Sequence, residues 1–129
     1  MLITGILNPQ LNSLLSRVRH TNVLVIADRG FPSWPAIETV DLALVDDIPR
    51  VLDVLAAIRR NFSIGQFWMA EEFCTHNDGA VHSRFSAAMH GVPVIYEPHT
   101  QFKQRVPHAL GIVRTADTIP YANLILESA

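Results

Sequence analysis

The 129-residue sequence lacks features that mark several large classes of protein. Its single cysteine, Cys74, rules out an internal disulfide framework and suits a reducing compartment. Ten basic residues stand against 12 acidic ones, so no basic field attracts nucleic-acid phosphates. No apolar run approaches the roughly 18 residues of a membrane span, and Asn8-Pro9-Gln10 interrupts any signal-peptide pattern. We therefore expect a cytoplasmic protein with no nucleic-acid partner and no membrane partner.

Motifs for cofactors and metals are also missing. Neither G-x-G-x-x-G nor G-x-x-x-x-G-K-[ST] occurs, so no nucleotide cofactor is indicated. Cys74, His76, His82 and His90 lack the tight paired spacing of a structural zinc site. We expect no cofactor and no metal.

What the sequence does contain is enough apolar material for a real core. Hydrophobic residues make up 49% and the net charge is only -2, which predicts one globular domain over residues 1–129. Charged residues are scarce, at 17%, and the mean hydropathy is +0.21. This balance predicts a homo-oligomer in which other subunits cover apolar surface.

Short apolar runs alternate with helical patterns along the chain. Asn8 is a predicted N-cap with Pro9 at the first helical position, and the helix is predicted to end near His20. The apolar run 23–27 predicts a strand buried on both faces. Further strands are predicted at 40–45, 66–70, 92–96, 110–114 and 122–126. Three further helices are predicted: one that begins after a cap at Asp46 or Asp47, one over 78–89 and one over 101–105. This alternation predicts an α/β fold, a three-layer α/β/α sandwich with a mixed, mostly parallel sheet of about six strands.

Polar residues follow several of these strands. Asp28 follows the first, Glu71 and Glu72 the third, and His99 the fourth. Ligands of open α/β sheets bind at the carboxyl ends of strands. His99 and Lys103, four residues apart, would share a helix face suited to an oxygen-rich ligand. The alternatives are turn residues, salt-bridge partners and a solvated basic helix face.

His20 precedes the first strand and is the leading residue for proton transfer. A helix end and a nearby Asp28 would both favour its protonated form, and imidazole exchanges protons near neutral pH. The alternative is a helix cap or a solvated side chain.

Tyr121 and Asn123 are two residues apart, so they share one face of a predicted strand. A phenol and an amide on one face suit the reading of sugar hydroxyls, and the alternative is a core Tyr beside an edge Asn. These residues begin their strand, whereas Asp28 ends its own. For them to meet, the last strand must run antiparallel to the first or come from another subunit.

Several stretches, taken in order and spacing, resemble the D-ribose pyranase / L-fucose mutarotase family along almost the whole chain. They are Gly5-Ile6-Leu7-Asn8, His20-Thr21, Ala27-Asp28, residues 37–44, Ala70-Glu71-Glu72, His99-Thr100-Gln101-Phe102-Lys103, Val113-Arg114-Thr115 and Pro120-Tyr121-Ala122-Asn123 with Ile125-Leu126. The Pro-Tyr-Ala-Asn and His-x-x-Phe-Lys patterns are closer to the ribose branch.

The resemblance implies an isomerase of carbohydrate metabolism that needs no cofactor. It would interconvert pyranose and furanose forms, or anomers, of a monosaccharide such as D-ribose by acid–base ring opening. His20 would be the catalytic acid/base, and the substrate-binding residues would be Asp28, His99, Lys103, Tyr121, Ala122 and Asn123. Family members form rings that stack into decamers, with sites between neighbours. The alternative function is a non-catalytic sugar-binding accessory protein of sugar uptake.

Overall fold

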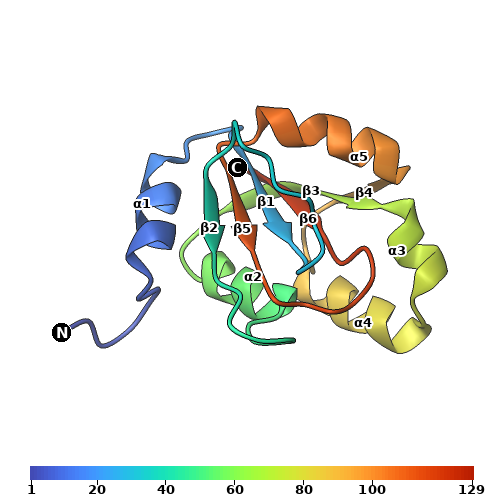
Figure 1. Ribbon diagram of the computed structural model, residues 1–129, viewed down its shortest axis with the longest axis horizontal. Coiled ribbons are helices and arrows are strands. Elements are labelled where there is room, and N and C mark those ends of the chain that lie inside the picture. Colours follow the sequence, from blue (N-terminus) through green and yellow to red (C-terminus); the bar gives the residue numbers. More distant parts are fainter.

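The computed structural model describes residues 1–129 and contains one six-stranded sheet with helices on both faces (Figure 1). The strand order is β2-β5-β1-β6-β3-β4, and β6 alone runs antiparallel to its neighbours. The strands are β1 (Val23–Ala27), β2 (Thr39–Asp41), β3 (Ile64–Ala70), β4 (Val94–Glu97), β5 (Gly111–Arg114) and β6 (Leu124–Ser128). The helices are α1 (Pro9–Arg17), α2 (Val51–Arg59), α3 (Glu71–His76), α4 (Gly79–Ala88), α5 (His99–Arg105) and a 3-10 turn, η1 (Val106–His108). The predicted α/β sandwich with a mixed, mostly parallel sheet is confirmed.

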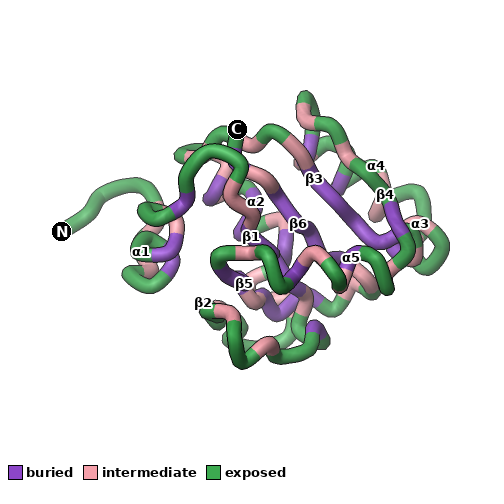
Figure 2. The backbone as a smooth tube through the Cα atoms, turned by 90° about the horizontal axis from the view of Figure 1, so that it is seen from above, coloured by how far each residue is buried: buried purple, intermediate pink, exposed green.

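The two faces of the sheet carry separate cores. Side chains of α1, α2 and α4 pack on one face, and alternate residues of β1 such as Leu24 and Ile26 point into this core. Val25 and Ala27 point the other way, toward Phe102 of α5. Burial is accordingly greatest along the central strands (Figure 2). No helix is long and apolar enough to cross a bilayer.

The first helix and strand form as their local sequence predicts. Asn8 Oδ1 accepts a hydrogen bond from the Leu11 N–H at 2.8 Å, and Pro9 opens the helix. The strand 23–27 is found with the predicted bounds. The helix, however, ends at Arg17, so His20 lies in the turn after it and not at a helix end.

The second helix begins differently from the prediction. Neither Asp46 nor Asp47 caps it, because residues 42–48 form a loop and the helix starts only at Val51. The first N–H of the helix, that of Val51, donates to Asp117 Oδ2 at 2.9 Å. A carboxylate 66 residues away in the chain thus holds the first turn, together with the local Asp53 carboxylate, which accepts the Arg50 N–H at 2.8 Å.

Replacing Asp117 with alanine should lower the stability of the fold. Asp117 is 1% exposed, and its other oxygen accepts the Ile119 N–H at 2.9 Å. Removing both acceptors leaves two N–H groups without partners, which costs about 3 kcal/mol. We expect a clear fall in Tm at fixed protein concentration. The exposed pair of Asp46 with Arg29 supplies the control, because Asp46→Ala should change Tm little; equal Tm values for the two variants would contradict the prediction.

Candidate active site

A cleft of about 270 Å³ lies at the carboxyl end of β1. Its walls come from the segments after β1, at the start of α5 and before β6: Asp28, Gly30, Phe31, Pro32, His99, Lys103, Pro120, Tyr121 and Asn123. Five of the predicted site residues therefore line one cleft in one chain. They meet because β6 is antiparallel to β1, which places the beginning of β6 beside the end of β1. Ala122, also predicted, is fully buried between Tyr121 and Asn123.

Asp28 and Asn123 form a hydrogen-bonded pair in the lining of this cleft. Asn123 Oδ1 accepts the Asp28 N–H at 2.7 Å, and Asn123 Nδ2 donates to Asp28 Oδ2 at 3.1 Å. The Gly30 N–H donates to Asp28 Oδ1 at 2.9 Å. Burial raises the pKa of the Asp28 carboxyl, and the hydrogen bonds from Gly30 and Asn123 oppose the rise. The carboxylate is held in one orientation by two partners.

His99 and Tyr121 form an aromatic part of the cleft wall. The His99 ring stacks on Phe102, with centroids 5.9 Å apart, and meets Tyr121 edge-on at 5.2 Å. Burial and then the Lys103 ammonium lower the pKa of His99, while Glu72 and Asp28 oppose this shift. The wall thus presents an imidazole whose pKa is lowered, which favours its neutral form.

Helix α3 supports this wall, a role that sequence reasoning missed. The Glu72 carboxylate accepts the His99 N–H, with its oxygens at 2.9 and 3.2 Å. Asn77, just after α3, donates through Nδ2 to the Pro120 carbonyl at 2.9 Å. The only signal in the sequence was the position of Glu72 after a predicted strand.

His20 lies outside the cleft. It is exposed in the turn before β1, where the neighbouring Thr21 N–H donates to the Ser128 carbonyl at 2.9 Å. Strand β1 separates this turn from Asp28, and five residues of strand span roughly 16 Å. The expectation that Asp28 lies near His20 is wrong within one chain, because closeness in sequence along an extended strand means separation in space.

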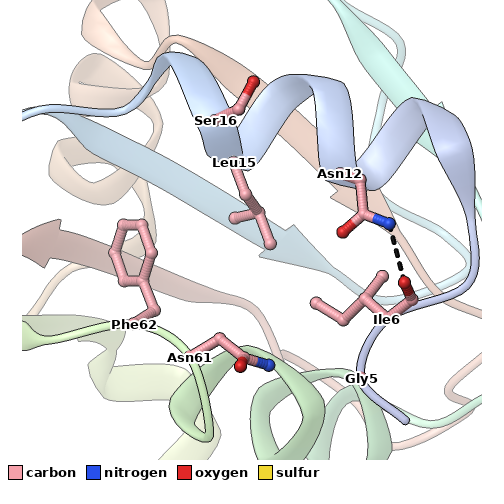
Figure 3. Close-up of a pocket in the computed structure, with 7 residues that line it drawn as sticks. All are labelled: Gly5, Ile6, Asn12, Leu15, Ser16, Asn61 and Phe62. Atoms are coloured by element: carbon pink, nitrogen blue, oxygen red, sulfur yellow. Dashed lines mark hydrogen bonds between the residues drawn. The ribbon is translucent and has the colours of Figure 1, made fainter. Parts of the chain in front are cut away.

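A second hollow of about 370 Å³ lies between α1 and the loop after α2 (Figure 3). It is lined by Gly5, Ile6, Asn12, Leu15, Ser16, Asn61 and Phe62. Asn12 Nδ2 donates to the Ile6 carbonyl at 2.7 Å, as the dashed line shows. No lining residue exchanges protons near neutral pH, so the smaller cleft is the better candidate for acid–base chemistry. No group of three or more His, Cys, Asp or Glu residues is arranged to hold a metal ion.

Comparisons with known proteins agree on one family. The model of the "RbsD / FucU transport protein family" matches residues 1–129. A D-ribose pyranase of Geobacillus kaustophilus is 42% identical over 125 residues, covering 97% of this chain and 91% of that protein. A D-ribose pyranase of Geobacillus thermodenitrificans is 40% identical, covering 96% of this chain and 93% of that protein.

Solved structures share the fold. Bacillus subtilis RbsD complexed with D-ribose is 29% identical and superposes with a TM-score of 0.92, covering 100% of this chain and 98% of that one. The fucose mutarotase of Streptococcus pneumoniae in complex with L-fucose has a TM-score of 0.80 at 20% identity, covering 95% and 92% of the two chains. The second likeness is one of fold alone.

Proposed function

Because this chain belongs to the RbsD / FucU transport protein family, we propose that it is a sugar pyranase or mutarotase, an isomerase acting on a monosaccharide such as D-ribose. The observation that carries the proposal is the cleft, where a carboxylate, an amide, a phenol, an imidazole and an ammonium group converge. These groups donate to and accept from hydroxyls, as a sugar requires. The single cysteine fits the cytoplasm, where we propose that the enzyme acts.

Ring opening needs only proton transfers. A base takes the proton of the anomeric hydroxyl, the bond from the anomeric carbon to the ring oxygen breaks, and an acid protonates that oxygen. The open-chain aldehyde then closes on its other face, giving the other anomer, or through another hydroxyl, giving the other ring size. Asp28, Tyr121 and Asn123 would hold the hydroxyls, joined by Lys103 and the backbone around Ala122. Positioned acid–base catalysis supplies roughly 10²–10⁴-fold, which is suitable for a reaction that already proceeds in water.

His20 of a neighbouring copy would complete the site as catalytic acid/base. The exposed position of His20, at the end of β1 opposite the cleft, supports this proposal. The apolar side chains of Leu44, Val45 and Ile48 are more than half exposed, and their loop is tied to the residue after Asp28 by the Arg29–Asp46 ion pair. Such a surface beside the cleft suits a contact between subunits. We propose a ring-based assembly, a homodecamer with sites between subunits.

A non-catalytic sugar-binding accessory protein is the second candidate. One observation favours it: a single chain already holds its sugar-binding groups in the cleft without His20. Binding a sugar without converting it requires only these groups.

Saturation-transfer NMR with D-ribose, L-fucose and other monosaccharides separates these functions. We expect saturation of one anomer or ring form of D-ribose to transfer to another at least about 10²-fold faster than in buffer. Light scattering on the same sample should give the mass of an oligomer, and dialysis against a chelator should leave the rate unchanged. Line broadening without transfer would indicate the accessory protein, and a monomer at micromolar concentrations would contradict the shared site.

A further inference from the structure

We propose that His99 is a second acid–base group of this site and that Glu72 is the residue that positions it. The inference rests on the proposed sugar exchange. Ring opening moves protons at two different oxygens of the sugar, so two groups, one giving and one taking a proton, serve it better than one. His99 lies in the cleft of the chain itself and would act in addition to His20, which a neighbouring copy would contribute.

The His99 ring is fixed in a useful orientation. Phe102 stacks on one side, with an interplanar angle of 15°, and Tyr121 meets the ring at 81°. Nδ1 is buried and has no hydrogen-bond partner in the chain. Because Nδ1 is buried, a sugar in the cleft does not reach it. The nitrogen that can act as the base is Nε2, which makes no hydrogen bond within the chain and belongs to a ring that lines the cleft.

Burial, followed by the charge of Lys103, favours the neutral form of the His99 ring. Lys103 faces it from its own helix, Glu72 from α3 and Asp28 from the end of β1. The other titratable neighbours are the Tyr121 phenol and, against Tyr121, the His76 ring. Burial and Lys103 lower the pKa of His99, whereas the Glu72 and Asp28 carboxylates raise it, and the net direction is downward.

A neutral His99 takes the proton of the anomeric hydroxyl. The bond between the anomeric carbon and the ring oxygen breaks, and its electron pair goes to the ring oxygen. The ring oxygen takes a proton from the protonated His20 of the neighbouring copy. Closure of the ring reverses both transfers, so each imidazole returns to its starting state and no other reactant is needed.

Glu72 holds His99 through the backbone. His99 is the first residue of α5, and both oxygens of Glu72 face its N–H, at 2.9 and 3.2 Å. The Glu72 carbonyl accepts His76 Nδ1 at 2.9 Å, and the His76 ring lies 4.9 Å from Tyr121. Glu72 is therefore linked to His99 directly and to Tyr121 through His76, and its charge also acts on His99.

The test compares Glu72→Gln with Glu71→Gln in the full chain, using D-ribose exchange from about pH 5 to pH 9. Glu71 is exposed on the same helix and makes no hydrogen bond or ion pair, so its variant should behave as the parent does. Glu72→Gln should lower kcat between about 10- and 100-fold with a smaller change in KM, because a misplaced group costs that much. Removing a carboxylate that raises the pKa of His99 should also shift the acid limb of the kcat profile to lower pH. Glu72→Asp should restore part of the rate.

A second measurement keeps the inference open to refutation if Glu72→Gln does not fold. In the parent protein, the NMR signal of the His99 ring should titrate at the pH of the acid limb and move when D-ribose binds. His99→Gln should bind ribose, lose at least about 10²-fold in kcat and lose that limb.

If the parent protein exchanges sugars, three results would overturn the inference. The first is a pH profile of kcat for Glu72→Gln that equals that of the parent, and the second is a lower kcat for Glu72→Gln with no shift of the acid limb. The third is an NMR signal of the His99 ring that does not move when ribose is added. A parent protein that exchanges no sugar would instead overturn the proposed function.

Discussion

Replacing His20 with glutamine should reduce sugar ring exchange by roughly 10²–10⁴-fold, toward the uncatalysed rate. The amide of glutamine still donates and accepts hydrogen bonds, but it does not shuttle protons. His20 is exposed in a turn, so its loss should leave the fold and the assembly intact. Saturation-transfer NMR measures the rate, and light scattering checks the assembly. Exchange at the parent rate would show that the proton-transfer assignment is wrong and would leave Asp28 or His99 as the catalytic group.

Mixing inactive variants tests whether neighbouring copies share the site. In the proposed shared site, His20→Gln would remove the group that a chain lends to its neighbour, and Asp28→Asn would disable the cleft of its own chain. In randomly mixed oligomers, about a quarter of the sites combine an intact His20 with an intact cleft. We expect activity to return after the two variants are unfolded and refolded together. If the mixture stays inactive although mixed oligomers form, His20 does not act across subunits.

Replacing Asn123 with alanine should weaken sugar binding and ring exchange together, with exchange falling about 10²-fold. Asn123 is 3% exposed and makes two hydrogen bonds to Asp28. The variant leaves the Asp28 N–H without its partner and frees the carboxylate to turn, at a cost of about 1–3 kcal/mol for the N–H alone. NMR titration with D-ribose measures the Kd, and saturation transfer measures the rate.

Asn61→Ala is the matched control for Asn123→Ala. Asn61 is an exposed asparagine that lines the other hollow, and it makes no side-chain hydrogen bond (Figure 3). Its replacement should change neither the Kd nor the exchange rate. If Asn123→Ala behaved in the same way, the pairing of Asn123 with Asp28 would be unimportant for the sugar.

Local sequence patterns predict those elements that their own residues and near neighbours define. The N-cap at Asn8 is a contact with a residue three positions along the chain, and the run 23–27 is recognised from its own apolar residues. Both are found as predicted, although the strand partners of 23–27 lie far away in the chain. The start of α2 depends on Asp117, far away in the chain, together with a local contact between the Arg50 N–H and the Asp53 carboxylate. The prediction of a cap at Asp46 or Asp47 failed for that reason.

The candidate site also contains some residues that the sequence predicts and some contacts that it does not. Residue type identifies Asp28, Tyr121 and Asn123, and the antiparallel β6 brings them together. The prediction that Tyr121 and Asn123 share one face of a strand is wrong, because β6 begins only at Leu124 and Tyr121 has a left-handed backbone. Whether the last strand was antiparallel or came from another subunit stayed open, because strand direction is decided by pairing across the sheet. The contact of Glu72 with His99 joins segments 27 residues apart, and the spacing of neither segment indicates it.

The left-handed backbone at Thr21 and Tyr121 has a consequence for protein engineering. Their φ values are 63° and 57°, in a region that side chains other than glycine occupy at a cost of roughly 1–3 kcal/mol each. One residue follows His20 and the other lines the cleft, so the conformational penalty falls on the two segments that would meet in a shared site. Glycine at Thr21 would remove this penalty, whereas glycine at Tyr121 would also remove a ring that packs against His76 and His99. A gain in Tm from the relieved backbone would come with looser placement of the reacting groups. At these two residues, which lie at opposite ends of the central strands, a change that raises stability is therefore expected to lower turnover.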